Sequence, residues 1–234
     1  MPEIKPVARI KSLYPGKFGI PRQSLLVPSP AEIIFEPEFA VAEAVRGLEQ
    51  FSHIWLIWGF SEAERKSWSP TVRPPRLGGN VRMGVFATRS PYRPNSLGLS
   101  VVELCGIELT DGVRLKIKGA DLMDGTPVYD IKPYLPYADS LPQANGGFAE
   151  RVKGDRLSVI APEDTENIPP DTLDEICEIV ASDPRPRYAG DSERIYGFEY
   201  GVYHIEFRCD GETATVLKIE KQGEKNYVDN PFHR

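Results

Sequence analysis

Two stiff, polar loops in the middle of the chain carry the residues best suited to bind a ligand. The first runs from Arg89 to Gly98 and the second from Asp124 to Tyr134. Both are rich in proline, glycine and charge, and both lie near apolar runs that are typical of strands. Because rigid loops held between strands often bind ligands, the sequence predicts a binding site here and not a hinge.

A third loop, Lys17 to Gln23, is stiffened by Pro21, which fixes its own φ and pushes Ile20 toward extended geometry. It therefore presents Arg22 and Gln23 from a rigid backbone. Arginine offers a fork of donors and glutamine offers both a donor and an acceptor, which suits recognition of a polar small molecule. Taken alone, the tripeptide would be an ordinary turn.

Common catalytic signatures are missing from the sequence. There is no GxGxxG, Walker or GxSxG motif, and with three histidines a Ser-His-Asp arrangement is improbable. We expect His53 to be a core or strand-end residue, the three cysteines to be buried free thiols, and no metal site. What remains suits orienting a molecule that is already reactive, as in group transfer from an activated cofactor.

Charge is distributed unevenly along the chain. The net charge of -6 argues weakly against nucleic acid. Between Arg65 and Val102, however, there are seven cations and no Asp or Glu. Such a block could form a basic face for a phosphate backbone, or it could be a solvated surface with distant carboxylate partners. The cations are Arg65, Lys66, Arg73, Arg76, Arg82, Arg89 and Arg93.

Short apolar segments must position these loops, and they predict an antiparallel barrel or sandwich in residues 1–153. A single clear helix is expected there, over Glu36 to Phe51, where apolar residues recur at a spacing of three. The segment from His53 to Phe60 is continuously apolar and predicts a strand buried on both faces. Further strands are expected at residues 5–13, 81–88, 97–109 and 113–118.

A small α+β domain is predicted over residues 154–234. Its helix should run from Pro169 to Val180, with acidic residues in the first turns that favour the helix dipole. A strand is expected at Leu157 to Ile160, and a hairpin from Gly201 to Lys221 around an Asp-Gly turn. No apolar run is long enough to span a bilayer and no signal-peptide core is seen, so the sequence predicts a cytoplasmic protein.

Five long motifs, in order along the chain, resemble the TrmO (TsaA-like) family of tRNA N6-threonylcarbamoyladenosine methyltransferases. The likeness extends through Asp183-Pro184-Arg185-Pro186 and the final hairpin, so it covers nearly the whole chain. The motifs are Phe18 to Gln23, Phe51 to Trp55, Val72 to Arg76, Gly84 to Leu99 and Asp124 to Tyr137.

The resemblance implies a β-barrel methyltransferase that works as a homodimer and holds S-adenosyl-L-methionine between barrel loops. The chain departs from the family at Ser61, where many relatives carry histidine, which puts a side-chain role there in doubt. By this likeness, the residues that contact the cofactor are Pro21, Arg22, Gln23, Ser61, Glu62, Arg89, Leu99, Met123, Asp124, Gly125 and Thr126.

The implied substrate is the modified adenosine immediately 3′ to the anticodon, whose N6 must lose a proton when it is methylated. We expect Asp130, Tyr134 or a backbone carbonyl of the Asp124 loop to accept this proton, with Asn95 helping to position the substrate. Non-catalytic binding of RNA or a nucleotide, or methyl transfer to a small metabolite, stays open as an alternative. The predicted tRNA contacts are Arg73, Arg76, Arg82, Arg93, Arg185 and Arg187.

Overall fold

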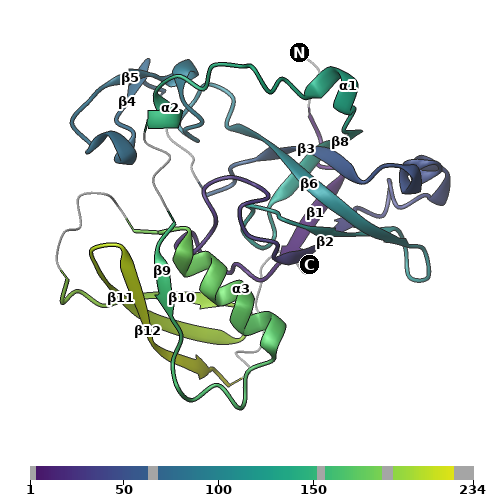
Figure 1. Cartoon of the computed structure of the whole chain (residues 1–234). Helices are drawn as coiled ribbons and strands as arrows, with labels where there is room; N and C mark the ends of the chain where they lie inside the picture. The colour runs from purple at the N-terminus through teal and green to yellow at the C-terminus, as the bar shows by residue number, and fades with distance from the viewer. Residues whose placement is uncertain (1–3, 63–67, 152–155, 186–191, 224–234) are drawn as a thin grey trace.

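The computed structural model describes residues 4–62, 68–151, 156–185 and 192–223 (Figure 1). Six antiparallel strands close into a barrel in the order β1-β2-β7-β6-β3-β8. Closure leaves no unpaired strand edge, and the predicted mainly-β barrel is confirmed. The strands are β1 (Ala8–Ser12), β2 (Pro30–Phe35), β3 (His53–Gly59), β6 (Leu97–Glu108), β7 (Arg114–Lys118) and β8 (Pro127–Pro133).

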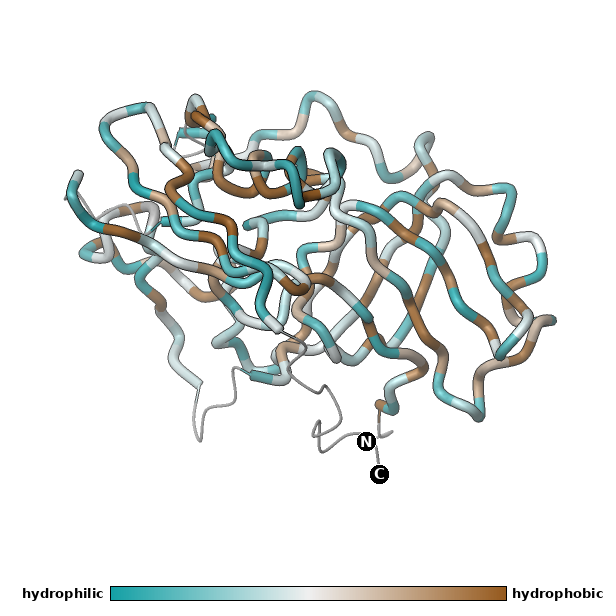
Figure 2. The backbone as a smooth tube through the Cα atoms, turned by 90° about the horizontal axis from the view of Figure 1, so that it is seen from below, coloured by the Kyte–Doolittle hydropathy of each residue, from teal (hydrophilic) through white to brown (hydrophobic). Residues whose placement is uncertain are grey.

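Alternate side chains along the strands fill the barrel, as a period of two residues requires. In β3, Ile54, Leu56 and Trp58 are buried, and the residues before and between them are half-buried. Only one face of β3 is fully buried, contrary to prediction, because the other face forms part of the outer wall. Figure 2 shows hydrophobic and hydrophilic segments alternating along the barrel strands.

The helix predicted over Glu36 to Phe51 is wrong. Two short 3₁₀ helices stand in its place, η1 (Ala42–Val45) and η2 (Leu48–Gln50), separated by Gly47 at φ +87°. A left-handed residue at this point ends one helical turn before the next begins. The apolar spacing of three matches the 3₁₀ repeat of three residues per turn better than the α-helical repeat of 3.6.

Two other stretches differ from their predicted structure. Residues 81–88, predicted as a strand, contain only the short β5 (Met83–Gly84) and the 3₁₀ helix η4 (Val85–Ala87). Strand β5 pairs with β4 (Thr71–Val72), and the 3₁₀ helix η3 (Pro75–Leu77) lies between them in the chain. Most of the second predicted loop is strand β8, because it pairs with both β1 and β3.

The C-terminal part is a four-stranded sheet with one helix across a face (Figure 1). The predicted helix and hairpin are confirmed, whereas β10 and, in the barrel, β2 were not predicted. Two short helices, α1 (Pro136–Asp139) and α2 (Phe148–Arg151), lie between the barrel and this sheet in the chain. The sheet order is β10 (Tyr196–Tyr200), β11 (Tyr203–Asp210), β12 (Thr213–Lys221) and β9 (Ser158–Ile160), with helix α3 (Pro170–Ala181).

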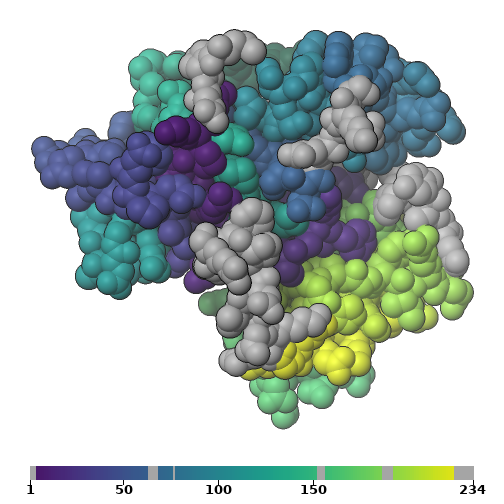
Figure 3. Space-filling model, turned by 180° about the vertical axis from the view of Figure 1, so that it is seen from behind, coloured from purple at the N-terminus to yellow at the C-terminus, as the bar shows by residue number. Residues whose placement is uncertain are grey.

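An N-terminal segment, residues 13–29, completes the core of the C-terminal sheet. Tyr14 and Val27 are buried in one cluster with residues of α3, β10, β11 and β12. The ring centroids of Tyr14 and Tyr200 are 5.3 Å apart, and the Gly201 amide donates to the Leu13 carbonyl at 2.7 Å. Figure 3 shows purple N-terminal residues directly against the yellow-green C-terminal ones. This core is therefore not built from C-terminal residues alone.

The cysteines are free thiols, as predicted, but only Cys209 is fully buried. Cys105 is exposed because it lies at a bulge in β6, between Leu104 and Gly106. Within the described residues, no group of three or more His, Cys, Asp or Glu could hold a metal ion. The same part of the chain contains no helix that could cross a membrane.

Candidate functional site

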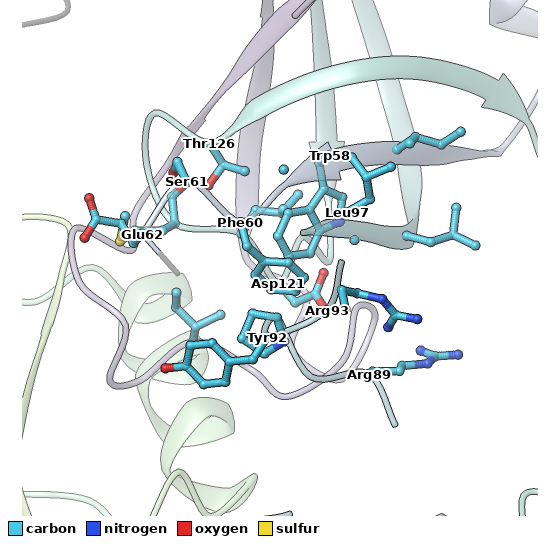
Figure 4. Close-up of a pocket in the computed structure, with 18 of the residues that line it drawn as sticks. Trp58, Phe60, Ser61, Glu62, Arg89, Tyr92, Arg93, Leu97, Asp121 and Thr126 are labelled. Atoms are coloured by element: carbon cyan, nitrogen blue, oxygen red, sulfur yellow. Dashed lines mark hydrogen bonds between the residues drawn. The ribbon is translucent and has the colours of Figure 1, made fainter. Parts of the chain in front are cut away.

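A cavity of about 870 Å³ opens beside the barrel, between loops that are far apart in the sequence (Figure 4). Its lining comes from residues 17–23, 57–62, 86–99 and 121–126. This volume is typical of a site for a cofactor-sized ligand. All three loops singled out from the sequence contribute to it, because the barrel brings the ends of β3, β6 and β8 together.

The inner wall of the cavity is aromatic. The rings of Trp58 and Phe60 have centroids 4.2 Å apart, and both line the cavity. Gly98 faces Trp58 from the neighbouring strand, where a Cβ atom would lie 2.2 Å from the indole ring. Glycine is needed here for steric room, because a side chain would overlap the indole of Trp58.

Asp121 is the site residue that sequence reasoning missed. Its carboxylate accepts a hydrogen bond from the Ser100 hydroxyl at 2.6 Å, and Ser100 accepts one from the Trp58 indole N–H at 3.0 Å. Burial raises the pKa of Asp121, against a lowering by the Ser100 hydrogen bond and the charge of Arg89. Figure 4 shows its side chain beside the rings of Trp58 and Phe60. The available signal was an acidic residue three positions before the predicted Asp124-Gly125 turn.

The Pro21-Arg22-Gln23 loop lines the cavity as predicted, but its polar side chains are already engaged. The Arg22 guanidinium donates to the carbonyl of Asp183 and, at 2.7 Å, to that of Arg185. The Gln23 side chain accepts a hydrogen bond from Arg89 and donates one to the Arg22 carbonyl. Arg22 therefore ties the cavity loop to the C-terminal part of the chain.

Most of the other predicted cofactor residues also line this cavity, namely Ser61, Glu62, Leu99, Met123 and Thr126. Glu62 lies at the exposed edge, where its carbonyl accepts a hydrogen bond from the Lys17 ammonium group at 2.8 Å. At the same edge, Ser61 is exposed.

Asp124 and Gly125 are not among the cavity residues. The Asp124 carboxylate accepts the Ser12 amide hydrogen at 3.0 Å, and Gly125 turns the chain at φ +77°. The Gly125 amide donates to the Ile10 carbonyl at 2.8 Å. These contacts hold the start of β8 against β1, so both residues stabilise the position of the 121–126 loop on the side away from the cavity.

The structure does not bring Asp130 and Tyr134 to the cavity. Asp130 forms an ion pair with Lys132 at 3.0 Å on a part-exposed surface of β8. Tyr134 packs against Trp55, with ring centroids 5.8 Å apart, near the start of β3. Of the three residues predicted to take part in catalysis, only Asn95 lines the cavity.

The predicted tRNA contacts are dispersed. Arg93 lines the cavity, while Arg73 and Arg82 are exposed on the segment around β4 and β5. Arg185 forms an ion pair with Asp183 at 2.7 Å. The side chain of Arg76 and the whole of Arg187 lie outside the described part of the structure.

Comparison with known families and proteins gives consistent matches over nearly the whole chain. The family model for the tRNA-methyltransferase O N-terminal domain matches residues 9–140, and that for the TrmO C-terminal domain matches residues 159–222. The tRNA (adenine(37)-N6)-methyltransferase of Escherichia coli is 44% identical over 230 residues, which cover 93% of this chain and 97% of that protein.

Two further comparisons extend the similarity. A putative S-adenosylmethionine-dependent methyltransferase of Pseudomonas aeruginosa, RcsF, is 42% identical, with 85% of this chain and 87% of that protein covered. The crystal structure of TrmO from Pseudomonas aeruginosa superposes with a TM-score of 0.75 at 33% identity, covering 94% of this chain and 99% of that one.

Proposed function

Because the chain belongs to the tRNA-methyltransferase O family, we propose that it methylates N6 of adenine 37 in tRNA with S-adenosyl-L-methionine. The substrate is the adenosine that already carries a threonylcarbamoyl group, next to the anticodon. One observation supports this best: of the eleven residues that the resemblance implies for the cofactor, nine line a single cavity.

The residues of the cavity fit this cofactor chemically. S-Adenosyl-L-methionine has a flat adenine, a sulfonium cation and an amino-acid end. Trp58 and Phe60 offer aromatic surface, and the Asp121 carboxylate offers negative charge in a partly buried place. Arg89 is exposed in the lining of the cavity and can meet a carboxylate. When bound, the cofactor supplies an activated methyl group, so the protein need only hold and orient its partners.

Residues on the open side of the cavity would receive the nucleoside. Asn95 and Arg93 lie there, in a loop whose conformation is held by hydrogen bonds from Arg93 to the Thr88 carbonyl at 3.3 Å and from the Tyr92 amide to Ser90 at 3.2 Å. A base in the anticodon loop can leave its stack at small cost and enter such a site. Together with Arg73 and Arg82, Arg93 would contact RNA phosphates.

Methyl transfer to defined RNAs tests this function. The chain is incubated with methyl-labelled cofactor and with tRNA that has or lacks the threonylcarbamoyl group. We expect label only in the modified tRNA. Cofactor binding without transfer to either RNA would indicate a non-catalytic binding module, and label in a small metabolite would indicate a different acceptor.

The proposal includes a homodimer that works in the cytoplasm, where tRNA is modified. Light scattering behind size-exclusion chromatography measures the mass of the particle in solution. A mass near twice that of one 26.2 kDa chain is expected, and a mass equal to one chain would contradict the dimer.

A further inference from the structure

Three large aromatic side chains are exposed at and beside the mouth of the cavity. Trp68 is 53% exposed, Phe86 71% and Tyr92 38%. Phe86 and Tyr92 also line the cavity, so the aromatic surface is continuous with the site. Exposed aromatic groups that adjoin a binding site often belong to an interaction surface, since water contact with such rings is unfavourable.

Trp68 and Phe86 come from two segments that backbone pairing holds together. Strand β4 pairs with β5, placing Thr71 opposite Gly84, and the Val85 amide donates to the Pro70 carbonyl at 2.9 Å. The ring centroids of Trp68 and Phe86 are 6.4 Å apart, with the rings inclined by 33°. These two exposed rings are therefore neighbours in a defined arrangement. In Figure 1, β4 and β5 lie to one side of the barrel.

A cation extends the aromatic surface toward the cavity. The Arg93 guanidinium carbon lies 5.9 Å from the centroid of the Phe86 ring. The indole of Trp68, the phenyl ring of Phe86 and the guanidinium group of Arg93 are therefore successive neighbours. This row of groups ends at the cavity, which Arg93 lines. Aromatic faces and arginine planes are the groups on which unstacked RNA bases are usually held.

The charge around these rings favours RNA over another protein. From Trp68 to Val102 there are five arginines and no Asp or Glu, although the chain carries a net charge of -6. A segment with arginine and aromatic rings but no carboxylate of its own attracts a phosphate backbone and also stacks bases. By contrast, the outward side chains of the C-terminal sheet include Glu199, Glu206 and Glu220.

We propose that Trp68, Phe86 and Arg93 form a stacking platform for the anticodon-loop bases that flank the methylated adenine. The inference rests on the proposed function, because it takes the ligand of the cavity to be a base of that loop. The platform would hold the neighbouring bases while the target base enters between Tyr92 and Asn95. Stacking on a π-face is tolerant of sequence, so the platform would serve tRNAs with different anticodon loops.

The test measures RNA affinity separately from catalysis. A fluorescently labelled anticodon stem-loop is titrated with Phe86→Ala, Trp68→Ala and the double variant, and binding is followed by anisotropy. We expect a loss of roughly tenfold per ring, within the range measured when one stacking residue is removed. Phe86→Tyr and Trp68→Phe, which keep a π-face, should restore most of the affinity. Leu109→Ala, directly after the far end of β6 and 54% exposed, is the matched control and should bind like the wild type.

Two more measurements decide between stacking and other roles. Calorimetric titration of Trp68→Ala, whose side chain is not among the cavity residues, should give an unchanged dissociation constant for the cofactor, and light scattering an unchanged particle mass. Unchanged RNA affinity would overturn the proposal. A change in particle mass would overturn it in favour of an interface between copies of this chain.

If the alanine variants do not fold, ultraviolet crosslinking of the wild-type chain to the same RNA replaces them. Crosslinks at Trp68, Phe86 or Tyr92 support the platform, and crosslinks confined to other residues contradict it. Failure of the proposed function gives a different result from failure of the platform. In that case the wild type itself would not transfer a methyl group to modified tRNA.

Discussion

Asp121 places a carboxyl group beside the aromatic inner wall of the cavity. Its carboxylate is held by Ser100 beside two aromatic rings, and burial raises its pKa. The folded protein therefore binds this proton more tightly than the unfolded chain does, and keeping the carboxylate ionised at neutral pH costs stability. A cationic ligand would offset that cost, so the same residue that weakens the empty protein would favour the sulfonium group of the proposed cofactor.

Asp121→Asn is expected to separate these two effects. Because the pKa of Asp121 is raised, its protonation stabilises the folded state. This stabilisation is complete at a pH below the ordinary pKa of aspartate, and it is lost as the pH rises through the pKa of Asp121 in the folded protein. The variant should therefore have a higher free energy of unfolding than the wild type at neutral pH, and a flatter pH dependence on the acid side.

Binding should change in the opposite direction. We expect Asp121→Asn to lose roughly tenfold or more in affinity for S-adenosyl-L-methionine, the usual scale for a charged partner, but little for S-adenosylhomocysteine, which has no sulfonium charge. Wild-type affinity for the charged form should also weaken as acid protonates Asp121. Equal losses for both ligands by calorimetry would show that Asp121 acts on the shape of the site and not through its charge.

At the scale of elements, the loop of residues 17–23 depends on the C-terminal part of the chain. The Arg22 side chain binds carbonyl groups after α3, while Phe18 stacks on Tyr196 with ring centroids 6.4 Å apart. Gly19, at φ +96°, lies where a Cβ atom would be 2.7 Å from the Phe198 ring. The loop thus contacts the C-terminal sheet on one side and the cavity on the other.

Arg22→Ala should consequently impair both the stability of the protein and its cofactor binding. Loss of hydrogen bonds from a charged donor predicts a destabilisation of about 1–3 kcal/mol in urea unfolding. Cofactor affinity should fall as the loop loses its position. Arg22→Lys should restore part of the stability and part of the cofactor affinity, because lysine keeps one charged donor. Arg46→Ala is the control: its ion pair with Glu43 spans 3.9 Å on an exposed surface and should change stability by less than about 0.5 kcal/mol. Full stability in Arg22→Ala would contradict the anchoring role.

At the scale of the whole molecule, the barrel and the C-terminal sheet share a stretch of chain. Residues 13–29 leave the barrel after β1, contribute Tyr14 and Val27 to the second core, and return as β2. The Tyr14 hydroxyl is also hydrogen-bonded to Ser29 at 2.6 Å inside this buried region. The C-terminal core loses Tyr14 and Val27 if the barrel unfolds, and residues 13–29 lose their packing if the C-terminal sheet unfolds.

We therefore expect one cooperative unfolding transition and not two. In differential scanning calorimetry the calorimetric and van't Hoff enthalpies should agree, and the far- and near-ultraviolet circular dichroism curves should coincide. Tyr14→Phe, which removes only the hydroxyl, should lower the midpoint without splitting the transition. Two resolved transitions in the wild type would show that the parts unfold independently despite the shared segment.

Much of the architecture follows from local sequence pattern. The apolar runs that became β3, β6 and β7, the helix α3 and the final hairpin are visible because their periodicity and turn residues are local properties. The motif loops likewise identify the family from the sequence. For this reason the barrel class, the small α+β part and nine of the implied cofactor residues at the cavity were all predictable.

Other features depended on tertiary structure. Strands β2 and β8 exist because barrel closure gives them partners on both sides, which no local propensity encodes. The same closure places Asp121 in the cavity and directs Asp130 and Tyr134 away from it. Arg22, which by its type suits ligand binding, lines the cavity and also binds a carbonyl group of the C-terminal part. A side chain's chemistry can be read from the sequence, but its partner is decided by which distant segments the folded chain brings together.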